Sequence, residues 1–149
     1  MGAFEEYYGF MEKFTDFYIE AQKLEFEKFD ALMSCELDRI QKVMKDYQAC
    51  IKKAQSYEEE RIELCKRLGF DNMAFSEIIS HFDDDEAIKL ISQKDRLTSI
   101  IKTIKYLNKR SMDFVNVQLS DIEEAASIYN TKGLADSHLA NSNLLNKQI

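Results

Sequence analysis

The sequence has no proline and no tryptophan, and it has only four glycines and two histidines among 149 residues. A proline inside a helix costs about 3 kcal/mol, so its absence leaves the whole chain open to helix formation. The glycines stand singly, and no glycine-rich loop exists that could bind a phosphate group. The two histidines, His81 and His138, are too few for most histidine-based metal sites.

Catalytic and metal-binding patterns are also missing. Glu77 and His81 stand four residues apart, whereas helical di-iron proteins use Glu-x-x-His, with a spacing of three. Four consecutive acids, Asp83 to Glu86, begin a helix and would not converge on one ion. No Ser/His/Asp or Cys/His set can be assembled from so few residues. The sequence predicts no enzyme, no metal and no cofactor.

Positive charge is scarce, since the net charge is −7 and the isoelectric point is near 4.9. This balance argues against nucleic acid and against an anionic membrane surface as partners. No apolar run approaches the 18 residues or so of a membrane span, and no basic-then-apolar signal starts the sequence. We therefore expect a cytoplasmic protein without membrane insertion.

The three cysteines, Cys35, Cys50 and Cys65, are fifteen residues apart. On one helix, consecutive sulfurs would be about 22 Å apart at 1.5 Å per residue. A disulfide needs Cα atoms within about 7 Å, so we expect three free thiols in a reducing compartment.

Apolar residues recur at three-four spacing along two long stretches, a pattern typical of coiled-coil packing. The first predicted seam is Leu37, Ile40, Met44, Tyr47, Ile51, Ala54, Glu58, Arg61, Cys65 and Leu68. The second is Leu90, Lys94, Leu97, Ile101, Ile104, Asn108, Ser111, Val115, Gln118, Ile122, Ala125 and Tyr129. The fold class predicted is all-α: an elongated antiparallel three-helix bundle or coiled coil with a short capping helix and a loosely structured C-terminal tail.

The first helix is expected over Ala3–Leu32, and its first five turns carry aromatic residues on more than one face. The favoured interpretation is an end of the bundle that the other helices wrap. A patch for self-association or for a partner is the alternative. Ser34 is a candidate N-cap of the second helix, and the sequence leaves open whether a turn or a kink precedes that helix.

The second helix should end at Leu68, because Gly69 suits the left-handed residue that closes a helix. A short helix within Phe75–His81 would cap the bundle. Asp83 with Glu86 forms a capping-box pattern at the start of the third helix.

The third helix should reach about Tyr129. Its length would be roughly 70 Å at 1.5 Å per residue, against about 45 and 50 Å for the first two. It must therefore overhang them or pair with both. Asn108, Ser111 and Gln118 are polar residues on its seam, and such residues fix register at a cost in stability.

Beyond Gly133 the sequence changes to a weakly charged, Asn- and Ser-rich stretch with scattered leucines. Such a segment gains its order mainly from what it packs on. The predicted division is a helical bundle domain at 1–133 and a C-terminal tail at 134–149 that becomes helical when packed on a partner.

Several linked motifs resemble the FlgN-type flagellar export chaperones. Glu58-x-x-Arg61-x-x-Leu64-x-x-x-Leu68-Gly69 resembles that family's end of the second helix, and Phe75-Ser76-Glu77-Ile78-Ile79 resembles its short helix. Asn108, Leu119, Ile122 and Tyr129-x-x-x-Gly133 resemble its long final helix.

The resemblance implies a cytoplasmic chaperone of the hook-filament junction proteins. Such a chaperone prevents their premature assembly and brings them to the flagellar type III export apparatus. Two alternatives stay open: a structural coiled-coil or tethering protein without a client, and an export chaperone of the flagellin or filament-cap type. The sequence also leaves open whether the protein is a monomer or a homodimer.

Family members use the C-terminal helical region for the client, which corresponds here to Ile122 and the residues beyond it. This is also the stretch that the sequence pattern marks as underpacked. The predicted partner-binding residues are Ile122, Ile128, Tyr129, Leu134, Leu139, Leu144 and Leu145.

Overall fold

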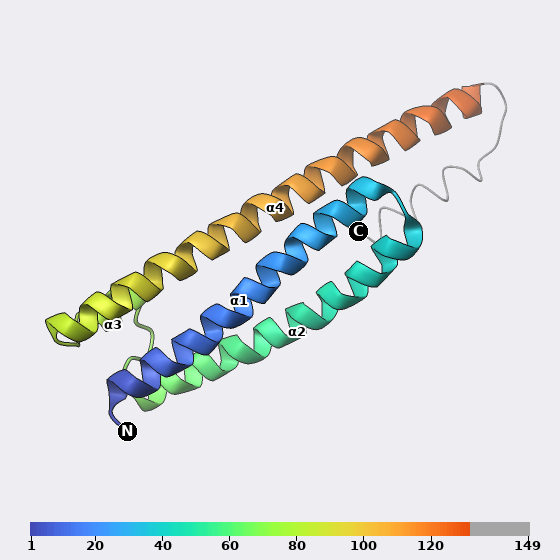
Figure 1. The fold of residues 1–149 in the computed structure, drawn as a ribbon. Helices are drawn as coiled ribbons and strands as arrows, with labels where there is room; N and C mark the ends of the chain where they lie inside the picture. Colours follow the sequence, from blue (N-terminus) through green and yellow to red (C-terminus); the bar gives the residue numbers. More distant parts are fainter. Residues whose placement is uncertain (132–149) are drawn as a thin grey trace.

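The computed structural model describes residues 1–131, and within them every regular element is a helix. The long helices lie side by side as rods, and the short helix lies beside the start of the last of them (Figure 1). The bounds are α1 Ala3–Ser34, α2 Leu37–Arg67, α3 Phe75–Ile79 and α4 Asp84–Thr131. The predicted all-α class, with three long helices packed antiparallel and a short capping helix, is confirmed.

Helix α1 is the middle of the molecule and packs against both α2 and α4. Gln93 bonds to the start of α1 and Asn108 to its later part, so α4 runs in the same direction as α1. Helix α2 runs back antiparallel to both (Figure 1). Within residues 1–131, no Cα of α2 lies within 8 Å of a Cα of α4. All backbone packing of the long helices therefore goes through α1.

A two-residue turn joins α1 to α2, so the chain makes a turn here and not a kink. Cys35 adopts the left-handed conformation with φ 54°, and Glu36 occupies the N-cap position of α2. The prediction that Ser34 is this N-cap is wrong, because Ser34 is the last residue of α1. Its hydroxyl donates to the Ala31 carbonyl at 2.6 Å and accepts the Glu36 N–H at 3.2 Å.

The end of α2 is a Schellman motif, which confirms the predicted stop. Gly69 has φ +83°, its N–H donates to the Lys66 carbonyl at 3.2 Å, and the Phe70 N–H donates to the Cys65 carbonyl at 2.7 Å. Phe70 and Cys65 are both buried in the adjoining core. The motif satisfies two helix-end carbonyls and turns the chain into the loop before α3.

The two glycines that flank this end of the molecule should respond oppositely to alanine. At Gly69, alanine has to adopt a left-handed conformation, so Gly69→Ala should destabilise the fold by about 1–2 kcal/mol. At Gly9, inside α1, an added Cβ meets no atom within 4 Å. Gly9→Ala should therefore stabilise the fold by about 0.8–1 kcal/mol through helix propensity. Urea unfolding of both variants measures this, and changes of the same sign would contradict it.

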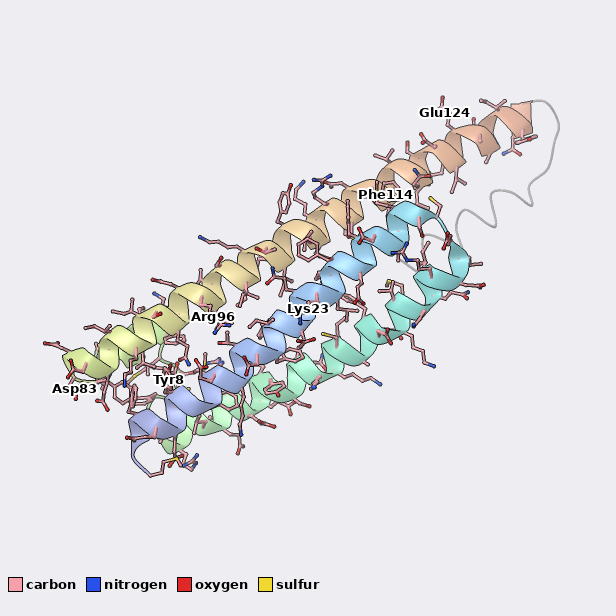
Figure 2. All side chains as sticks on the ribbon, viewed as in Figure 1. Tyr8, Lys23, Asp83, Arg96, Phe114 and Glu124 are labelled. Carbon is pink, nitrogen blue, oxygen red and sulfur yellow. The ribbon has the colours of Figure 1, made fainter. Side chains whose placement is uncertain are left out.

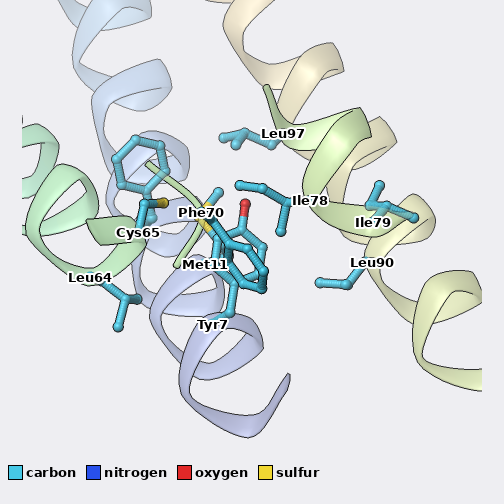
Figure 3. Packing of buried hydrophobic residues seen from close by; sticks show 10 residues of the cluster. Tyr7, Met11, Leu64, Cys65, Phe70, Ile78, Ile79, Leu90 and Leu97 are labelled. Carbon is cyan, nitrogen blue, oxygen red and sulfur yellow. The ribbon is translucent and has the colours of Figure 1, made fainter. Parts of the chain in front are cut away.

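The main core lies at the end of the molecule where α1 begins. Figure 3 shows Tyr7 and Met11 of α1 facing Phe70 of the loop, Ile78 of α3 and Leu90 of α4, all of them buried. The Tyr7 ring packs edge-on against Phe70 and Phe75, and burial raises the pKa of its hydroxyl. The interpretation of the aromatic first helix as a wrapped bundle end is confirmed here. Of its aromatic rings, Phe26 is the one left exposed.

The start of α4 agrees with the predicted capping pattern. Asp83 caps the helix, since its Oδ1 accepts the Glu86 N–H at 2.9 Å.

All three cysteines are free thiols, as predicted. Cys35 lies in the turn, however, and not on the same helix as Cys50 and Cys65.

The predicted seams fail in two places. On α2, Leu37 and Ile51 are exposed, because this helix packs against one long helix only and needs a narrower apolar stripe. Late in α4, Gln118 is exposed and Leu119 is buried instead. A straight helix drifts by about 20° per heptad from a 3.5-residue repeat, and this drift moves the buried line by one residue.

Halfway along the rods, a buried polar network joins all three. Glu25 and Lys28 of α1 are only 3 % and 4 % exposed, and Lys28 Nζ lies 2.9 Å from Glu25 Oε2. Lys28 also donates to Asn108 Oδ1 of α4 at 2.8 Å and stands 4.0 Å from the ring centre of Tyr47 on α2. The expected register function of Asn108 is supported by this contact.

Ionisation of Tyr47 should lower the free energy of unfolding in alkaline solution. Burial, the charge of Glu25 and a hydrogen bond to Glu25 raise the pKa of Tyr47 from 10.0 to about 12. Because the folded pKa exceeds the unfolded one, this contribution is complete below pH 10 and is lost as the pH rises from 10 to about 12. Urea midpoints across that range should fall less steeply in Tyr47→Phe than in the parent. Equal slopes would contradict the assignment.

Candidate functional site

The far end of α4 extends beyond the helices that support it. The last core contacts of α1 are made by Leu32 with Val115 and Leu119, flanked by Phe114 and by Ile40 of α2. Figure 2 shows Phe114 beside the end of α1 and Glu124 on the stretch of α4 that continues past it. Residues 120–131 form this overhang, which is about 18 Å long at 1.5 Å per residue.

Three of the predicted partner-binding residues lie on the overhang. Ile122, Ile128 and Tyr129 are between 37 % and 52 % exposed. Ile122 and Tyr129 are seven residues apart and lie within about 20° of each other around the helix. They also continue the side of α4 on which Ser111 and Val115 are buried against α1. This apolar side of α4 therefore runs on past Leu119, and on it Ala126, between Ile122 and Tyr129, is buried at 3 % exposure.

Ile128 lies elsewhere on the helix. Six residues separate it from Ile122, which places it about 120° around the helix. It shares this other face with Val117, eleven residues earlier and also exposed. Sequence reasoning missed Val117, although an eleven-residue spacing, three helical turns, would have aligned it with Ile128. The structure thus divides the predicted set into two faces. Leu134, Leu139, Leu144 and Leu145 lie outside the described residues.

The overhang is acidic. Between Arg110 and Thr131, helix α4 has four carboxylates, Asp113, Asp121, Glu123 and Glu124, and no lysine or arginine. The last turn has no basic residue either. The C-terminal end of a helix carries partial negative charge and is normally stabilised by cations. Both effects favour a partner with positive charge beside its apolar contacts.

Residues 1–131 hold neither a metal-binding cluster nor a membrane-spanning helix. Across residues 1–131, no group of three or more His, Cys, Asp or Glu side chains is placed to hold a metal ion. None of the helices described is both long and apolar enough to cross a membrane.

Comparison with known protein families identifies a match over most of the chain. The family model described as FlgN protein matches residues 1–136, which is most of the chain. The chain belongs to the FlgN family. No curated protein and no solved structure matches it.

FlgN proteins are flagellar export chaperones for the hook-associated proteins FlgK and FlgL, and they are not enzymes. Membership confirms the resemblance drawn from the second-helix end, the short helix and the Tyr-x-x-x-Gly stretch. It also decides against a tethering protein without a client and against a chaperone of the flagellin type. FlgN chaperones bind hook-associated proteins in the cytoplasm.

Proposed function

We propose that this FlgN chaperone holds its client at the α4 overhang together with residues 132–149. The anchors on α4 are Ile122 and Tyr129, joined by Leu134, Leu139, Leu144 and Leu145. The observation that carries the proposal is the continuation of the α1-facing apolar side of α4 past the end of α1, where Ile122 and Tyr129 are exposed.

The client's matching feature is an amphipathic helix with basic flanks. Spaced apolar anchors on one helix face suit recognition of such a helix in a groove. A tyrosine contributes a large area at low entropy cost and tolerates water before binding. Asp121, Glu123 and Glu124 beside the anchors would attract lysine or arginine on the client and speed the encounter. Covering an assembly-prone helix in this way would prevent premature assembly.

Residues 1–133 then form the bundle domain, and 134–149 form the tail that becomes helical on the client. Ordering a tail costs free energy, so affinity should be moderate. Moderate affinity suits a cytoplasmic chaperone that must release its cargo at the export apparatus. One chain presents one such site, and the mass of the complex in sedimentation will distinguish a monomer from a homodimer.

The test measures binding of a purified hook-associated protein to four variants. Tyr129→Ala and Ile122→Ala should each weaken binding about tenfold or more, as interface anchors do. A chain ending at Thr131 should bind more weakly still. Ile128→Ala, on the other face, should have the smaller effect of a rim residue. The melting temperatures of the three point variants should stay close to that of the parent, because the replaced side chains are 37–52 % exposed.

Ile88→Ala is the matched control, since Ile88 is an exposed isoleucine at the opposite end of α4. It should bind the client as the parent does. Full client affinity in the truncated chain and in Tyr129→Ala would rule out the C-terminal site.

A further inference from the structure

A groove lies at the other end of the molecule, lined by residues from the first turns of α1 and the last turns of α2. These two stretches of helix lie side by side in Figure 1. The groove has a volume of about 910 Å³ and is open to solvent along one side. Gly9 and Phe10 of α1 and Leu64 of α2 form its apolar part. The structure places it far from the α4 overhang, at the end where the chain begins.

The rim of this groove is strongly acidic. Five glutamate side chains line it against two cationic side chains, Lys13 and Arg67, which leaves a net side-chain charge of −3. Arg67 is already paired with Glu6, at 2.6 Å, so four carboxylates face one remaining lysine. These four are Glu5, Glu59, Glu60 and Glu63, and all are exposed.

Gly9 is the second observation, independent of the charges. A glycine inside a helix costs about 0.5–1 kcal/mol relative to alanine. Packing within the chain does not require it, because a Cβ at this position would meet no atom within 4 Å. Glycine is typical of positions where another molecule must approach the backbone closely. Here the missing side chain keeps the floor of the groove open.

We propose that this groove binds an amphipathic helix that carries lysine or arginine beside an apolar stripe. The apolar stripe would lie over Gly9, Phe10 and Leu64, and the basic residues would pair with the glutamates of the α2 rim. The exposed glutamates of the rim favour a partner with basic residues. The site is separate from the client site on the overhang and does not rest on it.

The probe is a fluorescent synthetic helix of leucine and lysine, with the leucines on one face. Its comparison peptide has the same composition in an order that gives no apolar face. Fluorescence anisotropy is measured on a chain that carries Ile122→Ala and Tyr129→Ala, so that the overhang does not bind the peptide, and this chain is the parent for every peptide measurement. The first peptide should bind it more tightly than the second. Binding should weaken with added salt, because exposed charges are screened beyond about 8 Å at physiological ionic strength.

Two variants of the groove test the site itself. Gly9→Leu places a side chain in the open floor and should weaken peptide binding about tenfold without lowering the melting temperature, since leucine favours helix over glycine. The double variant Glu59→Lys with Glu63→Lys reverses the charge of the rim and should weaken peptide binding about tenfold or more. Both variants should keep the client affinity of the parent.

The controls match these changes elsewhere on the rods. Thr98→Leu puts the same side chain on an exposed position of α4, and Asp46→Lys with Asp95→Lys changes the net charge equally on exposed positions. Both should bind the peptide as the parent does. Parent-like binding by the groove variants would overturn the proposal, and so would equal weakening in the controls.

A second copy of the chain or the client could fill the groove instead, and each would give a different result with Gly9→Leu. If a second copy of the chain fills the groove, Gly9→Leu will lower the mass in sedimentation and leave peptide binding unchanged. If the client fills it, Gly9→Leu will abolish client binding. Either result overturns the assignment to a separate basic helix.

Discussion

Replacing Lys28 with methionine should lower the free energy of unfolding by about 3–5 kcal/mol, the usual cost of leaving one member of a buried ion pair alone. Glu25 would be left at 3 % exposure without its cation. The variant would also lose the bond from Lys28 to Asn108 and the contact with the Tyr47 ring. At about 2–4 °C per kcal/mol for a chain of this size, the melting temperature should drop by roughly 10 °C.

The matched control is Lys23→Met, which removes a pair of the same spacing on the surface of the same helix. Lys23 Nζ lies 3.0 Å from Glu20 Oε1, but both side chains are mostly exposed. Such pairs contribute about 0–1 kcal/mol, so this variant should melt close to the parent. The double variant Glu25→Leu with Lys28→Met should recover most of the loss. Equal effects at positions 23 and 28 would show that the inner pair is not buried in solution.

Replacing Ile78 with alanine should cost about 2–5 kcal/mol, the range for large-to-small changes in a core. Ile78 is 0 % exposed and belongs to the core shared by α1, the loop after α2 and α4. Helix α3 has only five residues, too few to be stable without such packing. Chemical denaturation measures the loss.

Ile88→Ala is the control, because it deletes the same atoms from a side chain that is 66 % exposed. Its effect should stay within about 0.5 kcal/mol. A small effect at Ile78 would mean that the short helix does not close the core in solution.

The helix ends were predictable because their signals are local. Gly69 is the residue that tolerates φ +83° without strain, and Asp83 can cap the helix that begins next to it. The prediction that Ser34 is the N-cap of α2 was wrong because a serine hydroxyl can donate equally well to the carbonyl three residues earlier in its own helix. The choice between these two bonds depends on where the preceding helix stops.

The buried network was not predictable from the sequence. Glu25 and Lys28 have the spacing of an ordinary surface pair, and nothing local separates them from Glu20 and Lys23. They are buried because two other helices cover that side of α1, and this depends on contacts 80 residues apart in the chain. The position of the predicted site followed from the helix lengths, from the composition of the tail and from the resemblance to the family. Its division into two faces required the true register of α4.

Because α1 alone connects the other two rods, one side of α1 stays uncovered until α4 has been synthesised. When α2 has formed, α1 and α2 can already pair as a hairpin, while the side of α1 that α4 will cover is still uncovered. Residues 68–131 must follow first, which takes roughly 3–13 s at 5–20 residues per second. During each round of translation, this chaperone therefore exposes an apolar helix face of its own, the side of α1 that α4 will cover.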